Sequence, residues 1–228
     1  MAYTNSPMVV YTKLSPNNSG QRTHSIDRIT PHCVVGQCTA EGLEDWFYKS
    51  STRASSNYDI DKNGRVGMYV EEKNRSWCSS SNANDQRAVT IECASGTAEP
   101  YEMNDKVYET LIKLCADICR RNGKKKFLWL GDKNKTLSYT PAKDEMVITV
   151  HRWFANKSCL GTWLYARLPD LASKVTANLT DKTEPVKAEP KKYYRVQVGA
   201  YTVKANAEAQ LKKVKAAGFT DAFIKYGE

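Results

Sequence analysis

The chain has 228 residues, of which 41% are hydrophobic, and its formal net charge is +9 at pH 7. This length allows one domain of about 180 residues with its own core, together with a short appendage. No segment reaches the roughly 18 apolar residues of a membrane span, and the start MAYTNSPMVVYTKL lacks the apolar stretch of a signal peptide. We therefore expect a protein with no membrane span that is cytoplasmic when made.

The positive charge predicts a surface that attracts polyanions, such as nucleic acid, acidic lipid or the anionic polymers of bacterial cell walls. Nucleic-acid-binding proteins typically cluster Lys and Arg among aromatic residues. The basic residues here are dispersed apart from RRNGKKK, residues 120–126, so we expect no nucleic-acid partner. The seven cysteines form an odd, scattered set, which favours reduced thiols over a disulfide framework.

Three segments alternate like strands with one strongly apolar face. They are RITPHCVVG from residue 28, RAVTIECAS from residue 87 and EMVITVHRW from residue 145. Each segment places one ionisable side chain near its carboxyl end, and these are His32, Glu92 and His151. If the strands are neighbours in one sheet, the three side chains lie near the same edge.

Helical patterns separate these strands. Residues 39–51 fit a short helix with Thr39 as its cap. The segment over residues 103–123 carries an apolar helical stripe, with Asn104 or Asp105 as N-cap and Gly123 as the stop. Residues 160–179 fit one or two helices, with Pro169 in a first turn. Strands alternating with helices predict an α/β fold whose central sheet is packed by helices.

The composition changes once, at TDKTEPVKAEPKK, residues 180–192. This stretch is charged, contains two prolines and has one strongly apolar residue, which is typical of a linker. Beyond it, residues 193–228 read as a strand, an amphipathic helix that ends near Gly218, and a second strand. We therefore expect a domain over residues 1–179 and a small β-α-β unit after the linker.

The motif HRWFANKSC, residues 151–159, brings a cysteine back soon after the third strand. Together with His32 this motif supplies two imidazoles and a thiolate, a donor set that suits tetrahedral Zn²⁺ and leaves a fourth position open. The spacing alone leaves another interpretation open, in which Cys159 packs in the core and the histidines lie on the surface.

Four segments resemble, in the same order, the zinc-dependent N-acetylmuramoyl-L-alanine amidases of phage endolysins, bacterial muropeptide amidases and animal peptidoglycan recognition proteins. The segments are RITPHCVVGQCTAEGLEDWF, SSNYDIDKNGRVGMYVEEKNRSW, AVTIE and ITVHRWFANKSCLGTWLYARL. The resemblance covers most of residues 10–178 and implies a mixed central sheet packed by helices.

The resemblance implies a zinc ion bound by His32, His151 and Cys159. Glu92 matches a glutamate that several members place beside the water at the zinc, and Lys157 matches a lysine near the scissile carbonyl. The implied reaction is hydrolysis of the amide bond between N-acetylmuramic acid and L-alanine in bacterial peptidoglycan.

Two positions depart from the family pattern. Relatives usually have a tryptophan followed by a histidine at this point of the sequence. Here Trp77 matches the tryptophan, but Cys78 follows it. Some members have a tyrosine near the zinc, and the matching position in this chain is Ser56. Tyr58 lies two residues further on, on the same strand face. We expect Trp77 and Tyr58 as candidate substrate contacts.

The segment VQVGAYTVKANAEAQLKKVKAAGF, from residue 196, resembles a SPOR repeat, whose family binds septal peptidoglycan. A full member has two β-α-β halves, and residues 193–228 provide one. We therefore expect a half-length wall-binding unit, with Gln197 and Tyr201 as candidate glycan contacts. Homodimer formation through this unit would supply the second half.

Two alternatives to the amidase interpretation stay open. The first is a peptidoglycan-binding module without catalysis, although such modules usually lack the cysteine ligand. The second concerns the biological role, since an endolysin that lyses a host cell and a bacterial autolysin would share this chemistry. A wall-degrading domain without a signal peptide favours the endolysin.

Overall fold

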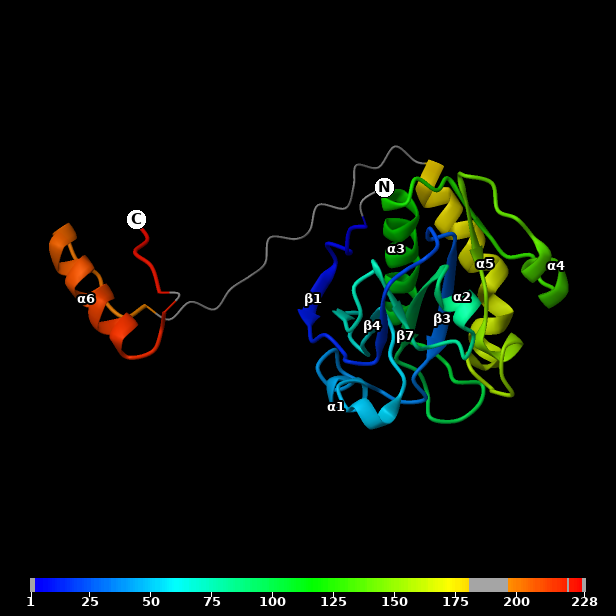
Figure 1. Cartoon of the computed structure of the whole chain (residues 1–228), viewed down its shortest axis with the longest axis horizontal. Helices are drawn as coiled ribbons and strands as arrows, with labels where there is room; N and C mark the ends of the chain where they lie inside the picture. Colours follow the sequence, from blue (N-terminus) through cyan, green and yellow to red (C-terminus); the bar gives the residue numbers. More distant parts are fainter. Residues whose placement is uncertain (1–2, 181–196, 221, 227–228) are drawn as a thin grey trace. The chain divides into compact units, whose positions relative to one another are not determined.

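The structure is a computed structural model that describes residues 3–180, 197–220 and 222–226 (Figure 1). The chain divides into two compact units, Met1–Ala188 and Glu189–Glu228, and each is described by itself. The predicted linker, residues 180–192, lies outside the described residues except for Thr180, which belongs to a helix. The predicted domain boundaries therefore stay a prediction.

A mixed sheet forms the centre of the first unit. Its strands are ordered β1-β5-β4-β7-β3-β9-β8, and the five from β4 to β8 run parallel, whereas β5 is antiparallel to β4. The bounds are β1 Val9–Thr12, β3 Arg28–Cys33, β4 Tyr58–Ile60, β5 Val66–Met68, β7 Ala88–Cys93, β8 Lys126–Leu128 and β9 Glu145–Ile148. A separate antiparallel pair joins β2 Asn18–Gln21 to β6 Asn74–Ser76. The predicted α/β fold is confirmed.

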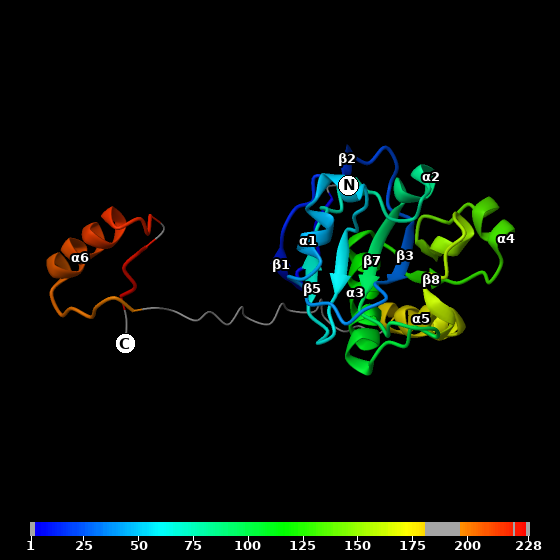
Figure 2. The ribbon, with the colours of Figure 1, turned by 90° about the horizontal axis from the view of Figure 1, so that it is seen from below.

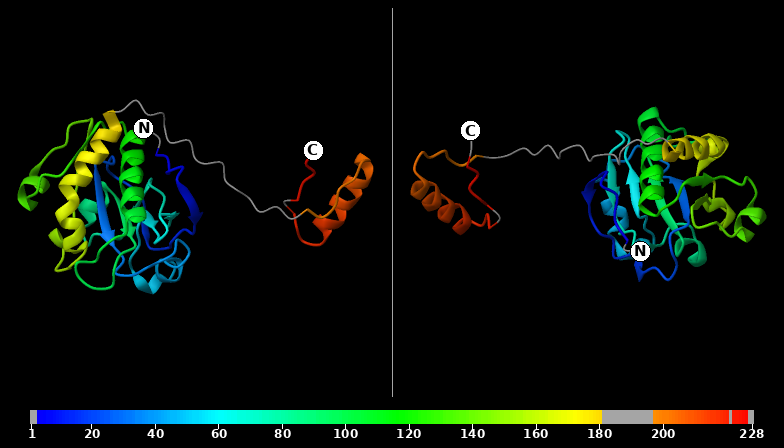
Figure 3. Two further views of the ribbon diagram at one scale, coloured as in Figure 1. Left: turned by 180° about the vertical axis from the view of Figure 1, so that it is seen from behind. Right: turned by 90° about the horizontal axis from the view of Figure 1, so that it is seen from above.

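Helices lie on both faces of this sheet. Two long helices, α3 (Asp105–Arg121) and α5 (Gly161–Thr180), lie side by side over one face (Figure 3). The short helices α1 (Glu44–Phe47) and α2 (Asn82–Asp85) lie on the other side (Figure 2). Further short elements are the 3-10 turns η1 (Ser50–Thr52) and η2 (His151–Trp153) and the helix α4 (Lys133–Ser138).

The main core lies between the sheet and the two long helices. Its largest contributions come from aliphatic side chains that are almost fully buried, namely Ile29, Ile91, Met146, Ile148, Leu111, Leu114, Ile118, Leu164, Leu168, Leu171 and Val175. Burial of each such side chain stabilises the fold by about 1.5–3 kcal/mol. Cys115 and Cys119 are fully buried in α3, as their place in the apolar stripe predicts.

Helix α3 begins and ends where its sequence predicts. The Asn104 side chain accepts a hydrogen bond from the Val107 amide, so Asn104 rather than Asp105 is the N-cap. Gly123 has a φ of 68°, the left-handed conformation that suits the residue after a helix. The apolar face of α3 is thereby set against the strands that carry the ionisable residues.

Two helices differ from the prediction. The expected helix over residues 39–51 shortens to α1, because Thr39 accepts from the Gly42 amide and closes a turn instead of capping a helix. Helix α5 is continuous, and Pro169 lies in its interior rather than in a first turn. An interior proline costs about 3 kcal/mol, which burial of the apolar face of α5 offsets.

The described residues of the second unit form helix α6 (Lys204–Ala216), with irregular segments before and after it. The predicted helix is confirmed, but no strand forms in residues 197–203 or 222–226. The first predicted strand also includes residues 193–196, which lie outside the described residues. A strand needs a partner for its backbone groups, and α6 has no buried residue on which such strands could pack. Among the described residues, no helix is long and apolar enough to cross a membrane.

Candidate metal centre

His32 lies near the end of β3, in the middle of the sheet. Its neighbours in register are Glu92 on β7 and, one strand further, Asp59 on β4. The three side chains therefore project from the same face, away from α3 and α5. His32 is only 1% exposed, so the position of its ring is fixed by the sheet.

His151 is close to His32 because β9 pairs with β3 in parallel. The strand ends at Ile148, and His151 begins the turn η2 instead of continuing the strand as predicted. The turn directs the imidazole towards His32, and the two ring centroids are 5.0 Å apart. A side chain at the strand's end thus reaches the same site by a different backbone route.

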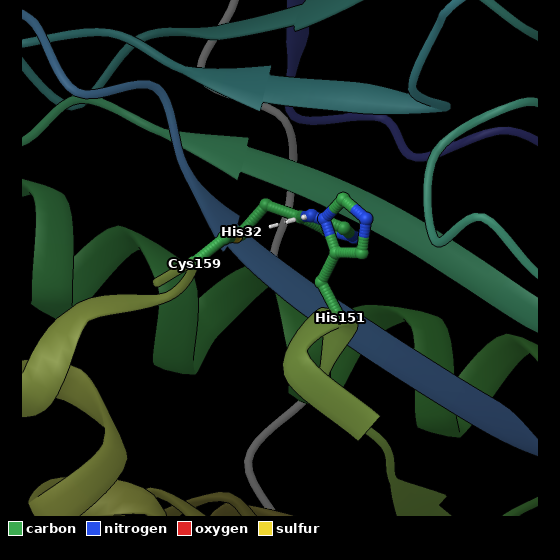
Figure 4. A group of neighbouring side chains, drawn as sticks. All are labelled: His32, His151 and Cys159. Atoms are coloured by element: carbon green, nitrogen blue, oxygen red, sulfur yellow. Dashed lines mark hydrogen bonds between the residues drawn. The ribbon is translucent and has the colours of Figure 1, made fainter. Parts of the chain in front are cut away.

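Cys159 returns to these rings from the loop before α5 (Figure 4). Its Sγ atom lies 3.3 Å from Nδ1 of His32. Arg152 closes this loop, because its guanidinium donates to the Ser158 carbonyl at 2.7 Å. One donor atom from each of His32, His151 and Cys159 lies within 4.8 Å of the other two.

The electrostatics of this group suit a bound cation. Burial lowers the pKa of His32 well below its usual value, with a further contribution from His151, and burial and Lys157 lower the pKa of His151. Both rings are thus neutral at pH 7, as metal ligands must be. A hydrogen bond with Cys33 and burial raise the pKa of the Cys159 thiol, so a nearby cation is needed to stabilise its thiolate.

Glu92 lies beside the group. Its Oε1 atom is 3.9 Å from Nδ1 of His32, and burial raises its pKa to about 7. Glu92 and His151 line a cavity of about 200 Å³ that opens next to them. The apolar and aromatic part of its lining comprises Val34, Leu43, Trp46, Phe47, Ala54 and Trp77. A carboxyl group that can exchange a proton near neutral pH thus faces an amphipathic cavity next to the donor set.

A buried polar network holds these elements together. The Thr30 and Thr149 hydroxyls are 2.7 Å apart and join β3 to the residues after β9. Asn84 of α2 donates to Thr30 at 3.0 Å and accepts from Thr149 at 3.0 Å. All three side chains are fully buried, so each depends on the others for its hydrogen bonds. The network fixes the spacing of the strands that carry the two histidines.

A family model described as N-acetylmuramoyl-L-alanine amidase (Amidase_2) matches residues 22–162, which include all of this group. The chain belongs to this amidase family. A SPOR domain model matches residues 167–227. Its first part overlaps α5, whose Leu168, Leu171 and Val175 pack in the amidase core.

The fold is similar to that of a solved structure. A selenomethionine derivative of AmpD has a TM-score of 0.51 at 14% identity, with 74% of this chain and 99% of that chain covered. The TM-score is 0.46 for the N-acetylmuramoyl-L-alanine amidase LysC from Clostridium intestinale URNW, at 16% identity, with 78% of this chain and 94% of that chain covered. The TM-score is 0.47 for PlyL, at 15% identity, with 73% of this chain and 96% of that chain covered. No curated protein matches the sequence significantly.

The remaining predicted site residues of this amidase divide into two groups. Trp77 lines the cavity, and Lys157 lies exposed on the loop between His151 and Cys159. Gln197 and Tyr201 are exposed in the second unit. Nothing in the described residues supports the expected homodimer.

Tyr58 lies away from the site, contrary to the expectation of a substrate contact. Its register partner on β7 is Ile91, which faces the core, and Tyr58 itself is 0% exposed. Its hydroxyl donates to Glu72 at 2.7 Å and accepts from the Ser6 amide at 2.8 Å. These contacts leave no route for a substrate, so Tyr58 has a structural role.

Ser80 is a site residue that the sequence did not indicate. Its Oγ atom lies 2.9 Å from Nε2 of His151, and its φ of 64° places it in the left-handed region. A ligating histidine usually donates its second N–H to such a partner, which fixes the ring and leaves the other nitrogen free for a metal. Ser80 therefore orients His151.

We expect Ser80→Ala to weaken zinc binding about 10–100-fold, the usual cost of losing an outer partner of a ligating histidine. Isothermal titration of the metal-free protein measures this change. Ser138→Ala is a matched control, because Ser138 is exposed on α4 and bonds only within that helix. Equal zinc affinity of Ser80→Ala and the wild type would show that Ser80 does not orient His151.

Asp59 is a buried acid next to this site. It is 0% exposed, and neither carboxylate oxygen has a hydrogen-bond partner among the described residues. A Cβ on Gly67 would lie 2.1 Å from Oδ1 of Asp59, so only glycine fits opposite it. Burial, with a smaller contribution from Asp61, raises the pKa of Asp59 from 3.8 to about 8.

We expect Asp59→Asn to raise the free energy of unfolding by about 4 kcal/mol at pH 7. The folded protein holds this proton more tightly than the unfolded chain, so wild-type stability falls as pH rises from about 4 to about 8. The side-chain amide of the Asp59→Asn variant does not titrate, so this contribution to the pH dependence of stability is absent from the variant. Urea unfolding at several pH values measures it, with exposed Asp45→Asn as control. Equal pH dependence in wild type and Asp59→Asn would contradict the expectation.

Proposed function

We propose that this amidase is zinc-dependent and that His32, His151 and Cys159 bind the ion. The observation that carries the proposal is the placement of these three donors within 4.8 Å of one another, beside Glu92 and the cavity. Two neutral imidazoles and a thiolate match the preference of zinc. When bound, zinc supplies a Lewis acid that polarises a carbonyl and makes water more acidic.

Glu92 acts as the proton carrier. Water attacks the carbonyl carbon of the lactyl group, and its proton passes to the Glu92 carboxylate. The C–N bond then breaks as Glu92 returns the proton to the nitrogen of L-alanine, because an amine anion is a poor leaving group. The products are the carboxylate of N-acetylmuramic acid and a stem peptide with a free amino group.

The cavity and its neighbours orient the substrate. Trp77 and Glu92 both line this cavity of about 200 Å³. We assign Trp77 to contact with the sugar or peptide next to the scissile bond. Lys157 lies on the loop between His151 and Cys159. Its ammonium group stabilises the negative charge that develops on the carbonyl oxygen.

The second unit holds the enzyme on the wall. A SPOR domain match fits peptidoglycan binding, and Gln197 and Tyr201 are our candidate contacts with glycan. Attachment through this unit keeps the catalytic unit close to further stem peptides and so raises their effective concentration.

Digestion of purified Gram-positive cell walls tests the proposed reaction. We expect the wild type to release new amino termini of L-alanine without new reducing sugar ends. A chelator is expected to stop the release, and added zinc to restore it. Reducing ends would mean cleavage of the glycan instead. Bound walls without any release would identify a binding module, and full activity in chelator would exclude the metal requirement.

A further inference from the structure

A second cavity, of about 670 Å³, lies at the amino ends of the parallel strands. Its lining includes Asp27, Arg87 and Lys143, which come shortly before the first residues of β3, β7 and β9. The candidate metal centre lies near the carboxyl ends of the same strands. Arg28 and His32, both in β3, are separated by about 13 Å of extended chain. This cavity is therefore separate from the site of the proposed reaction.

The lining of this cavity is strongly basic. It contains five Lys and Arg side chains but one carboxylate, Asp27. The five cations are Arg22, Arg87, Arg121, Lys124 and Lys143. A cavity lined by an excess of one charge concentrates ions of the opposite charge, so we expect an anionic ligand.

The three arginines already have partners in the fold. Arg22 is 4% exposed, and each nitrogen of its guanidinium donates a hydrogen bond. Arg87 donates to Asp27 at 2.8 Å, and Arg121 donates to Glu72 at 3.0 Å. These arginines add to the positive potential of the cavity, but their donors are largely used.

The two lysines keep donors free for a ligand. Lys124 follows the end of α3, and its ammonium donates one hydrogen bond, to the Lys143 carbonyl at 3.1 Å. Lys143 is exposed, and its ammonium has no hydrogen-bond or ion-pair partner among the described residues. An ammonium group has three N–H donors, so most of the donors of this pair are available to an anion.

The size and the other lining residues of the cavity indicate the class of anion. A volume of about 670 Å³ is in the range of sites that hold a ligand larger than a single small ion. Single-stranded nucleic acid is bound by stacking of its bases on aromatic side chains, but Tyr3 is the one Phe, Tyr or Trp side chain in the lining. A polyol phosphate chain needs cations and hydroxyl partners instead. The lining supplies hydroxyl groups from Thr4, Thr23, Ser25 and Thr140.

We propose that this cavity binds a phosphodiester polymer of the bacterial cell wall, such as a chain of glycerol phosphate units, with Lys124 and Lys143 on its phosphates. The inference goes beyond the proposed reaction, from which it takes only the cell wall as the place where the enzyme acts. The polymer gives the catalytic unit its own attachment to the wall, in addition to the second unit.

Isothermal titration of the full-length protein with poly(glycerol phosphate), in chelator and at low salt, tests this proposal. We expect Lys124→Gln and Lys143→Gln each to weaken binding about 10-fold, the usual cost of one hydrogen bond to a charged group. Each variant should also reduce the slope of log K against log salt by about 1. Lys113→Gln and Lys133→Gln are matched controls, because both lysines are exposed and lie outside the cavity. Both controls should keep the wild-type affinity.

Three results would overturn the proposal. The first is absence of binding by the wild type, and the second is an equal loss in the cavity variants and the controls, which would show a diffuse effect of charge. The third is equally tight binding of a single-stranded oligonucleotide or of polyglutamate, with the same sensitivity to Lys124→Gln. Cleavage of a soluble muropeptide at the wild-type rate shows that the variants are folded. Polymer binding by a protein that cleaves no wall would refute the proposed reaction alone, and cleavage without polymer binding would refute this inference alone.

Discussion

Cys159→Ser is expected to remove zinc from the protein and to abolish release of L-alanine amino termini from cell walls. A serine hydroxyl keeps its proton at neutral pH and is a poor ligand for zinc. Removal of a residue that only hydrogen-bonds to a ligand weakens metal binding about 10–100-fold. The loss of Cys159, which is itself a proposed ligand, should weaken zinc binding by more than this. Elemental analysis after dialysis measures the zinc content, and the wall assay measures activity on the same sample.

Cys38→Ser is a suitable control for this variant. Cys38 is also half-buried, but among the described residues its thiol does not belong to the donor group of the proposed metal centre. This control should keep both zinc and activity. An active, zinc-containing Cys159→Ser protein would refute the ligand assignment, whereas a zinc-containing but inactive one would indicate that Cys159 acts in catalysis and not in binding.

Strand alternation predicted correctly which strand face carries His32 and which carries Glu92. The alternation in β3 and β7 put His32 and Glu92 on polar faces, and the structure places them in register on one face. The same reasoning was available for β4, where Tyr58 and Ile60 alternate with Asp59. The apolar pair faces the core and Asp59 faces the site, so the family resemblance was a poorer guide to Tyr58 than the alternation itself.

Contacts made by loops could not be predicted in this way. Ser80 reaches His151 across 71 residues of sequence, and Asn84 joins Thr30 to Thr149. Neither residue has a local pattern that distinguishes it from other polar loop residues. Trp46 lines the cavity from α1, which begins only after a turn at Gly42. Such contacts arise only when the sheet brings distant segments together.

Glu92→Gln is expected to reduce kcat about 10²–10⁴-fold while zinc stays bound, because glutamine cannot carry the proton from water to the leaving nitrogen. The substitution keeps the size of the side chain and an oxygen that can accept from Cys78, so the cavity keeps its shape. KM should change little, since the proton carrier acts in the transition state rather than in substrate binding. Steady-state kinetics on a soluble muropeptide separate kcat from KM.

The zinc content of Glu92→Gln distinguishes the possible roles of this carboxyl. Glu92 also belongs to a second donor group, with His32 and Cys78, so loss of zinc in the variant would identify it as a ligand. An unchanged kcat would show that another group carries the proton. If kcat falls while zinc content and KM are kept, the carboxyl acts on the reacting atoms, and its place beside His32 serves catalysis rather than metal binding.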